Sequence, residues 1–366
     1  MVDFKETDYN SYLSGDLPEG CKYCVRGSKV VIYVTGLCPR DCWFCPLSER
    51  RKDKDVIWAD EWPINDESEF DKIITESELI DAEGAGITGG DPLLKIDRTI
   101  KIIELLKNRF DDFHIHLYTS LNLVDKDKLK RLYDSGLDEI RFHPDFDNKK
   151  YWKRIKLAKE YDWDIGIEIP LLVDKKSEII ELVDYSHNLI DFLNLNEFED
   201  PKKFDKELSK KSVVLGKEII NHAKRYDINI HLCTMSLKDG IQLKNRMKRR
   251  AKNVEKAYDI IDDGLLVRGT IYSKKLNPQT KNYNKLIKGS NQNIINDLIN
   301  LKKELSEFVE DSLLEIDKER LKILTRIDII EYLSKELIDE YKDFKFCIEK
   351  EYPTWDKIVI EREFLN

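Results

Sequence analysis

Three cysteines in one short segment are the residues of this chain most suited to chemistry. Cys38, Cys42 and Cys45 lie in the run GLCPRDCWFCPLS with C-x3-C-x2-C spacing. This spacing brings three thiolates onto one loop, close enough to bind one metal centre, and leaves one coordination position open. An open position on a redox-active cluster is a place where a cofactor or substrate can bind. A partial zinc site and a chance grouping of cysteines are the alternatives that spacing alone leaves open.

The segment before the triplet predicts where this loop lies in the fold. Residues 30–35 form an apolar run typical of a buried strand, and Gly36 ends it. The cysteines therefore follow the carboxyl end of a strand, and α/β barrels build their active sites at that edge. Phe44, an aromatic residue, stands directly before the third cysteine.

This triplet, on a loop after the first strand and with an aromatic residue before its last cysteine, resembles the signature of the radical SAM superfamily. The resemblance implies a 4Fe–4S cluster on Cys38, Cys42 and Cys45 whose fourth iron binds S-adenosylmethionine (SAM). It also implies one-electron cleavage of the sulfonium to a 5′-deoxyadenosyl radical, which abstracts hydrogen from a substrate. Within the superfamily, the chain is similar to an archaeal group related to the activating enzymes of pyruvate formate-lyase.

Composition limits the classes of protein that this chain can be. Its 366 residues suffice for one large domain or for a barrel with an appended domain. The net charge of −9 excludes a general polycation, so a nucleic-acid partner would need a local basic patch. Residues 238–252 are the candidate basic patch, and a solvated helix face is the alternative interpretation. The basic residues of this patch are Lys244, Arg246, Lys248, Arg249, Arg250 and Lys252.

Location and cysteine chemistry follow from two further patterns. The chain lacks the run of about 18 apolar residues that a membrane span requires, and residues 1–12 do not resemble a signal peptide. We therefore expect a cytoplasmic protein. Five of the seven cysteines fall within residues 21–45, which favours metal binding over a disulfide framework.

Beyond the cysteine loop, strand-like runs alternate with helix-like segments. This alternation predicts parallel βα units, and six such units match the partial (βα)6 barrel of radical SAM enzymes, with room for a seventh strand. The expected strands are residues 30–35, 86–88, 114–119, 139–142, 165–169, 191–195 and 228–233.

The pattern changes beyond about residue 262. Strands and helices there follow the order strand, helix, strand, strand, helix, strand, which predicts a ferredoxin-like split βαβ arrangement. Residues 277–290 are expected to form a polar loop within it. We therefore expect an N-terminal segment 1–29, a barrel over 30–260 and a C-terminal α+β domain over 261–366.

Polar residues follow the second strand. Gly89-Gly90-Asp91-Pro92 resembles the GGEP motif of radical SAM enzymes, with Asp in place of Glu. The resemblance implies that this segment binds the amino group of the cofactor, and glycines let a backbone approach a ligand closely. A plain Gly-Asp-Pro turn is the alternative.

Further candidates stand at the ends of later strands. Glu168 lies inside an apolar run, where an ionised carboxylate needs a partner such as Arg141 or a cofactor hydroxyl. Thr119 could reach a ribose or carboxylate with its hydroxyl group. The remaining candidate contacts to cofactor or substrate are Ser120, Asn194, Asn196 and Glu197, with an ordinary strand-end cap as the alternative for each.

A second metal site is predicted from three other cysteines. Cys21 and Cys24 form a C-x2-C pair before the first strand, and Cys233 ends the seventh strand at the same edge as the first cluster. This half-site is common in zinc and iron–sulfur ligation. An auxiliary iron–sulfur cluster, a zinc site and unmetallated thiols all remain open. Cys347 stands between apolar residues and is expected to be simply buried.

These observations lead to two functional hypotheses. The first is a radical SAM enzyme that takes electrons from a donor such as a ferredoxin or flavodoxin. Its substrate is unknown, and tRNA or another macromolecule is one candidate because an appended domain can recognise one. The second is a noncatalytic, zinc-stabilised RNA- or protein-binding module. The C-x3-C-x2-C triplet disfavours the second, since closed zinc sites usually pair C-x2-C half-sites.

Overall fold

The computed structural model describes residues 5–7, 9–199, 205–276, 278, 292–337 and 339–365. The chain forms two compact units, Met1–Arg246 and Met247–Asn366, and each is described by itself. The three segments expected from the sequence, with boundaries after residues 29 and 260, stay a prediction.

Seven parallel strands form the centre of the first unit, in the spatial order β3-β6-β7-β8-β9-β10-β11. All seven expected strands are present within a few residues of their predicted bounds, which confirms the α/β class and the partial barrel. Their bounds are β3 Lys29–Tyr33, β6 Gly84–Thr88, β7 His114–Ser120, β8 Glu139–His143, β9 Asp164–Pro170, β10 Phe192–Asn196 and β11 Asn229–Cys233.

Short antiparallel strands extend both edges of this sheet, so the complete sheet is mixed and has eleven strands. One edge carries β4 (Ile57–Ala59) and β5 (Trp62–Ile64), and the other carries β2 (Tyr12–Ser14) and β1 (Lys5–Glu6). The sheet therefore curves without closing on itself.

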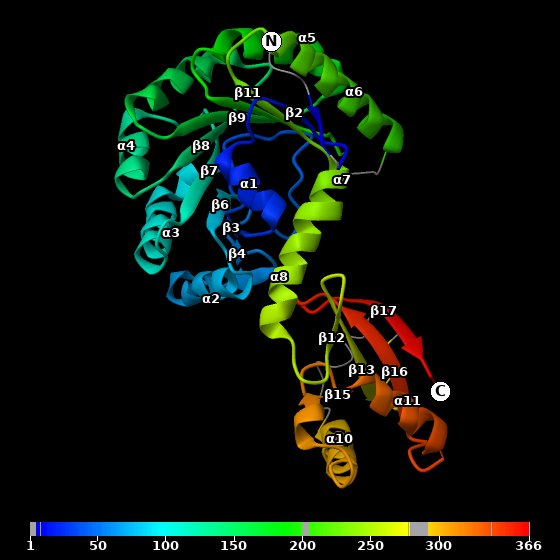
Figure 1. The fold of residues 1–366 in the computed structure, drawn as a ribbon. Coiled ribbons are helices and arrows are strands. Elements are labelled where there is room, and N and C mark those ends of the chain that lie inside the picture. Colours follow the sequence, from blue (N-terminus) through cyan, green and yellow to red (C-terminus); the bar gives the residue numbers. More distant parts are fainter. Residues whose placement is uncertain are drawn as a thin grey trace. The chain divides into compact units, whose positions relative to one another are not determined.

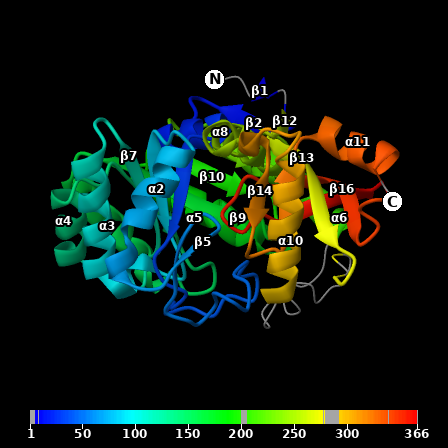
Figure 2. The ribbon, with the colours of Figure 1, turned by 90° about the horizontal axis from the view of Figure 1, so that it is seen from below.

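Helices cover the convex face of the sheet, and both views place α3 and α4 at the periphery of this unit (Figures 1 and 2). Side chains alternate between the faces of a strand, so one face can be apolar while the other is polar. On the convex face Ile87, Leu117 and Ile167 are fully buried in the core against these helices. The covering elements are α2 Asp71–Leu79, α3 Ile96–Arg109, α4 Lys126–Asp134, the 3-10 helix η3 Lys149–Glu160, α5 Lys176–Ser186 and α6 Lys206–Ala223.

One helix, α1 (Glu19–Arg26), lies on the concave side of the sheet and contacts β3, β6 and β7 (Figure 1). Gly27 ends it in the left-handed conformation, with φ of 70°, as glycine favours after a helix. Gly20 is required by close packing, because a Cβ there would lie 2.5 Å from Nδ1 of His116. The sequence analysis did not predict a helix in this position.

The second unit contains an antiparallel sheet in which four strands take the order β14-β15-β13-β16. Two helices connect these strands, and α10 lies alongside β14 (Figure 2). This order is that of the predicted split βαβ arrangement. The bounds are β13 Leu265–Ser273, α10 Gln292–Leu305, β14 Glu315–Asp317, β15 Lys322–Thr325, α11 Ile327–Glu336 and β16 Phe344–Glu351.

Two added strands widen that sheet. β12 (Ile260–Asp262) pairs with β13, and β17 (Val359–Phe364) pairs with β16. The core between sheet and helices contains Ile271, Leu298 and Phe346, all fully buried. The loop expected at 277–290 lies outside the described residues except for Pro278.

Candidate active site

The cysteine triplet lies on the long loop between β3 and β4, at the carboxyl edge of the parallel strands. The loop folds back on itself, because Gly36 N donates to Lys54 O at 2.7 Å and Gly36 O accepts from Asp53 N at 3.0 Å. A Cβ at Gly36 would lie 1.7 Å from Arg51 O, so only glycine fits. All three thiols are free and partly buried, and Cys45 N donates to Cys42 O at 3.1 Å.

The segment after β6 packs directly against this loop. Gly90 N donates to Thr35 O at 2.7 Å, and Asp91 N donates to Leu37 O at 2.8 Å. A Cβ at Gly89 would lie 2.4 Å from Thr35 O, and one at Gly90 would lie 2.2 Å from Leu37 O. The two glycines therefore permit close approach to the cysteine loop itself. Their contact with a cofactor stays a prediction.

The Asp91 carboxylate is fully buried and receives four hydrogen bonds. The donors are Thr119 Oγ1 at 2.7 Å, Ser120 Oγ at 2.6 Å, Ser120 N at 3.2 Å and Leu93 N at 3.1 Å. Burial raises the pKa of Asp91, while these donors oppose the rise. A carboxylate offers about four acceptor sites, so the chain itself occupies them. Asp91, Thr119 and Ser120 thus tie the ends of β6 and β7 together beneath the cysteine loop.

Arg40, between the first two cysteines, attaches the loop to the end of β8. Its Nη1 donates to His143 O at 2.8 Å, and its Nη2 lies 3.5 Å from the Asp145 carboxylate. The Phe44 and His143 ring centroids are 5.9 Å apart. Sequence reasoning missed Arg40 and His143 as site residues, although the position of Arg40 inside the triplet was a usable signal.

Tyr33, at the end of β3, lies beneath the triplet and was also missed. Its buried hydroxyl has no hydrogen-bond partner among the described residues, and the Arg51 guanidinium lies 5.2 Å from its ring. Burial raises the pKa of Tyr33 to about 12, and negative charge on Cys45 and Cys38 acts in the same direction. This unpartnered donor near two thiols fits a cluster, whose sulfur atoms accept hydrogen bonds.

Glu168 projects from the middle of β9 onto the concave face. Arg141 Nη1 donates to its Oε2 at 2.7 Å, which confirms the expected partner. Asn194 Nδ2 donates to Oε2 and Asn196 Nδ2 to Oε1, each at 3.0 Å. Burial alone would raise the pKa of Glu168, but the Arg141 charge and the two amide donors lower it to about 2. The side chain keeps 19% of its surface accessible, so an ionised carboxylate faces an accessible space.

Further buried groups around Arg141 lack partners. Arg141 also pairs with Glu139 and donates to Tyr118 Oη at 3.2 Å, yet its Nη2 has no acceptor among the described residues. Among the same residues, neither ring nitrogen of His116 has a hydrogen-bond partner, and no donor reaches Asn194 Oδ1. Burial lowers the pKa of His116 far enough to keep it neutral. Unpaired buried polar atoms are costly, so the concave face is suited to a polar ligand or water.

The second group of cysteines also lies on the concave side. Cys21 Sγ accepts from Asn194 Nδ2 at 3.1 Å, and Cys233 Sγ lies 3.7 Å from Gln242 Nε2. Burial is the main cause that raises the pKa values of Cys21 and Cys233. Negative charge on Cys24 raises both pKa values further, so Cys24 lies near each of them. Within the described residues, no three His, Cys, Asp or Glu side chains are grouped to hold a single ion, and this includes the loop triplet Cys38, Cys42 and Cys45. A second metal site therefore stays a prediction.

Three other candidates have structural contacts. Glu197 accepts from Met235 N at 2.7 Å and from the Ser209 hydroxyl, as a strand-end cap would. Cys347 is fully buried in β16, as expected. In the basic segment, Arg246 pairs with Asp60 and Glu61, so part of that charge is already neutralised.

The amino-acid sequence is similar to those of known proteins. The family pattern described as the Radical SAM superfamily matches residues 32–191. A Methanocaldococcus jannaschii protein, named as a candidate glycyl-radical enzyme activating enzyme, is 36% identical over 380 residues, covering 94% of this chain and 92% of its own. Biotin synthase of Psychrobacter cryohalolentis is 27% identical over 143 residues, covering 38% of this chain and 36% of its own.

Among solved structures, the methyltransferase TsrM of Kitasatospora setae with tryptophan and a SAM analogue is 13% identical, with a TM-score of 0.33 over 48% of this chain and 37% of its own. No helix in the described part of the chain is long and apolar enough to cross a bilayer.

The near full-length match at 36% identity and the family pattern across the barrel agree with the site. The chain belongs to the radical SAM superfamily, in a group related to glycyl-radical enzyme activating enzymes, and is an enzyme that uses a 4Fe–4S cluster and SAM.

Proposed function

We propose that Cys38, Cys42 and Cys45 hold the catalytic 4Fe–4S cluster of this enzyme. The observation that carries the proposal is three free, partly buried thiols on one hydrogen-bonded loop, near the Tyr33 hydroxyl, which has no hydrogen-bond partner among the described residues. Thiolates are the usual ligands of iron–sulfur clusters, and three leave one iron open. When bound, the cluster would supply one electron that breaks a sulfonium carbon–sulfur bond of SAM, giving methionine and a 5′-deoxyadenosyl radical.

The remaining residues orient this chemistry. Arg40 anchors the loop to β8, and Asp91 with Thr119 fixes the backbone of Gly89 and Gly90 beside it. We propose that this glycine backbone lines the SAM site. Its other wall would be Glu168 and its amide partners, Asn194 and Asn196. Glu168 stays ionised at neutral pH and accepts hydrogen bonds from ligand hydroxyl or ammonium groups.

For the substrate, we propose a macromolecule from which the radical abstracts hydrogen. The name of the M. jannaschii relative favours a protein in which removal of a glycine hydrogen leaves a glycyl radical, because the likeness spans nearly the whole of both chains. A tRNA is the second candidate, with residues 238–252 as its phosphate contact. It has weaker support, since Arg246 is engaged by two carboxylates and the Arg250 guanidinium donates to Pro353 O.

For Cys21, Cys24 and Cys233, we propose a second iron–sulfur site, with zinc as the alternative metal. Its support is the placement of all three thiols on the concave side, where Cys21 Sγ lies 3.1 Å from Asn194 Nδ2. Iron and zinc content of a Cys38→Ala, Cys42→Ala, Cys45→Ala variant tests this. Iron retained at roughly the level of one cluster supports the second site, and its complete loss without zinc contradicts it.

The main proposal is tested by SAM cleavage. Anaerobically reconstituted protein with dithionite and SAM is expected to release 5′-deoxyadenosine, while Cys42→Ala is expected to release none. Cys347→Ala is the matched control, since Cys347 is buried in the other sheet, and it is expected to keep the activity. Equal release by Cys42→Ala, or bound zinc without iron in the native protein, would contradict the proposal.

A further inference from the structure

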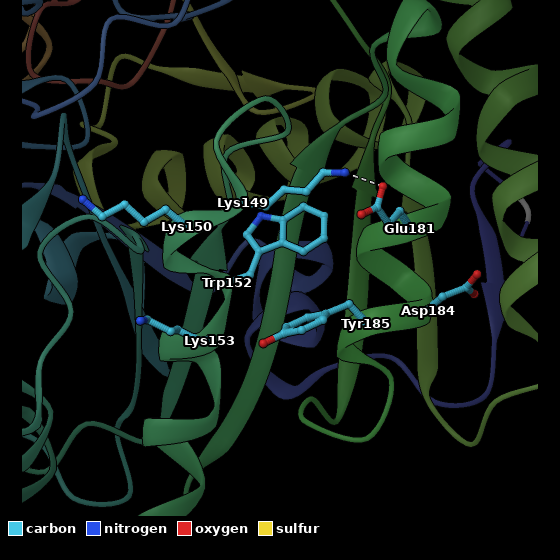
Figure 3. Close-up of a pocket in the computed structure, with 7 residues that line it drawn as sticks. All are labelled: Lys149, Lys150, Trp152, Lys153, Glu181, Asp184 and Tyr185. Atoms are coloured by element: carbon cyan, nitrogen blue, oxygen red, sulfur yellow. Dashed lines mark hydrogen bonds and ion pairs between the residues drawn. The ribbon is translucent and has the colours of Figure 1, made fainter.

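A groove runs along the outside of the first unit, between η3 and α5 (Figure 3). Its volume is about 490 Å³. Trp152 lies between the two elements and is only 3% exposed, whereas Tyr185 of α5 is 43% exposed. The lining residues are Lys149, Lys150, Trp152, Lys153, Glu181, Asp184 and Tyr185.

The exposed side of η3 carries a row of lysines. Lys149 pairs with Glu181 across the groove, while Lys150 and Lys153 extend away from α5 (Figure 3). In the part of the chain that the structure describes, four of these lysines form no ion pair, although the whole chain has a net charge of −9. A local positive surface on an acidic protein steers acidic partners to one place. The four are Lys150, Lys153, Lys156 and Lys159.

The floor of this groove is connected to the cysteine loop. Trp152 Nε1 donates to Asp145 O at 2.8 Å. The Asp145 carboxylate lies 3.5 Å from Nη2 of Arg40, the residue between Cys38 and Cys42. Two polar contacts therefore separate the groove from the proposed cluster ligands. Electron transfer slows steeply with distance and proceeds better through bonds and hydrogen bonds than through empty space.

We propose that this groove is the docking site of an acidic one-electron donor protein that reduces the catalytic cluster. This inference rests on the proposed function. One electron leaves the donor and enters the cluster, so the donor is oxidised and no covalent bond changes at the groove. Electron-transfer partners use small contact areas, below about 1,200 Å², so the exposed lysine row of η3, of which Lys149, Lys150 and Lys153 line the groove, is a suitable surface.

An RNA partner fits the same surface less well. Trp152 is nearly buried, so Tyr185 is the one lining aromatic side chain with an exposed ring for stacking. The hydrogen bond from Trp152 Nε1 to Asp145 O links the groove to the cysteine loop, a link that a bound electron donor would use.

The test compares two triple variants with the same change in net charge. Lys150→Glu, Lys153→Glu, Lys156→Glu reverses the η3 row, and Lys206→Glu, Lys210→Glu, Lys211→Glu on exposed α6 is the control. We measure the affinity of oxidised acidic flavodoxin by titration calorimetry, and 5′-deoxyadenosine release with reduced flavodoxin or with dithionite. The η3 variant is expected to bind at least about tenfold more weakly and to lose flavodoxin-driven release in proportion, with dithionite-driven release unchanged.

The proposal would be overturned if the η3 variant equalled the α6 control in flavodoxin binding and in flavodoxin-driven release. It would also be overturned if the η3 variant lost tRNA binding and kept flavodoxin binding. Failure of the proposed function looks different, because wild type would then release no 5′-deoxyadenosine even with dithionite. Trp152→Phe tests the route separately. It removes the donor to Asp145 O and is expected to slow flavodoxin-driven cluster reduction at unchanged flavodoxin affinity, and an unchanged rate would exclude this route.

Discussion

Two of the buried charged networks in this enzyme can be compared, one on the concave face of the parallel sheet and one in the sheet of the second unit. In the first, Arg141 of β8 lies between the carboxylates of Glu139 and Glu168. In the second, Lys322 of β15 lies 2.8 Å from Glu349 and 3.2 Å from Glu351 of β16. In each network one strand cation lies between two acidic side chains, in a parallel sheet for Arg141 and in an antiparallel sheet for Lys322. The two networks can therefore be compared directly.

The networks differ in completeness. Around Lys322, Glu349 also accepts from Arg362 at 2.5 Å and from the Tyr272 hydroxyl at 2.8 Å, so it is well satisfied. Around Arg141, Nη2 and both nitrogens of His116 have no partner within the described residues, and Glu168 keeps accessible surface. A buried network that pairs its own atoms is expected to act in stability, whereas one with spare donors and acceptors is suited to a ligand.

The largest effect is expected from Arg141→Met. This change leaves Glu139 and Glu168 buried without their cation, which costs about 3–5 kcal/mol in the free energy of unfolding. It also releases Glu168 from its position, so SAM cleavage should fall even in protein kept folded at low temperature. Denaturant unfolding and 5′-deoxyadenosine release measure the two effects. Loss of stability with full SAM cleavage would show that the concave network is merely structural.

The matched change in the second unit is Lys322→Met. Arg362 continues to neutralise Glu349, so the cost is expected near 3 kcal/mol, at the lower end of the range for a broken buried pair. SAM cleavage per folded molecule should equal that of wild type. Reduced cleavage by the folded fraction would break the distinction between the two networks.

Glu168→Gln separates charge from shape. The amide keeps the size of the side chain, and Arg141 retains Glu139, so the stability loss should be only about 1–3 kcal/mol. Loss of a charge-assisted hydrogen bond should weaken SAM binding by about 10- to 100-fold, measured by calorimetry on the reconstituted protein. Unchanged SAM affinity would remove Glu168 from the cofactor site.

The last test is a pH dependence. The pKa of Glu168 is lowered from 4.5 to about 2 in the folded state, so its ionised form stabilises the fold above about pH 4.5. That contribution is lost as the pH falls from 4.5 towards 2. The stability difference between wild type and Glu168→Gln should therefore shrink across this window. A difference that stays constant with pH would mean that ionisation of Glu168 contributes nothing.

Much of this fold was predictable because strand periodicity and parallel order act locally. The apolar alternation around Ile167 and Ile169 identified β9, and it also marked Glu168 as an inward carboxylate in need of a partner. The cysteine loop could be placed at the carboxyl edge because Gly36 ends β3 directly before it. Both inferences use residues adjacent in sequence.

The unpredicted features depend on contacts between distant segments. The saturation of Asp91 requires Ser120 from the next strand, and the group that Glu197 caps, Met235 N, lies 38 residues later in the chain. The position of α1 depends on the small size of Gly20 beside His116, nearly a hundred residues away in sequence. Periodicity says which face a side chain takes, but not which donors from elsewhere reach it.

The central claim is that three cysteines hold a cluster with one iron left open for SAM. It is tested most directly by Mössbauer spectroscopy of a Cys21→Ala, Cys24→Ala, Cys233→Ala variant reconstituted with enriched iron, recorded with and without SAM. The account predicts a 4Fe–4S spectrum in which one iron changes on SAM addition while the other three do not. A spectrum that SAM leaves unchanged, or a protein that takes up no cluster, would contradict it.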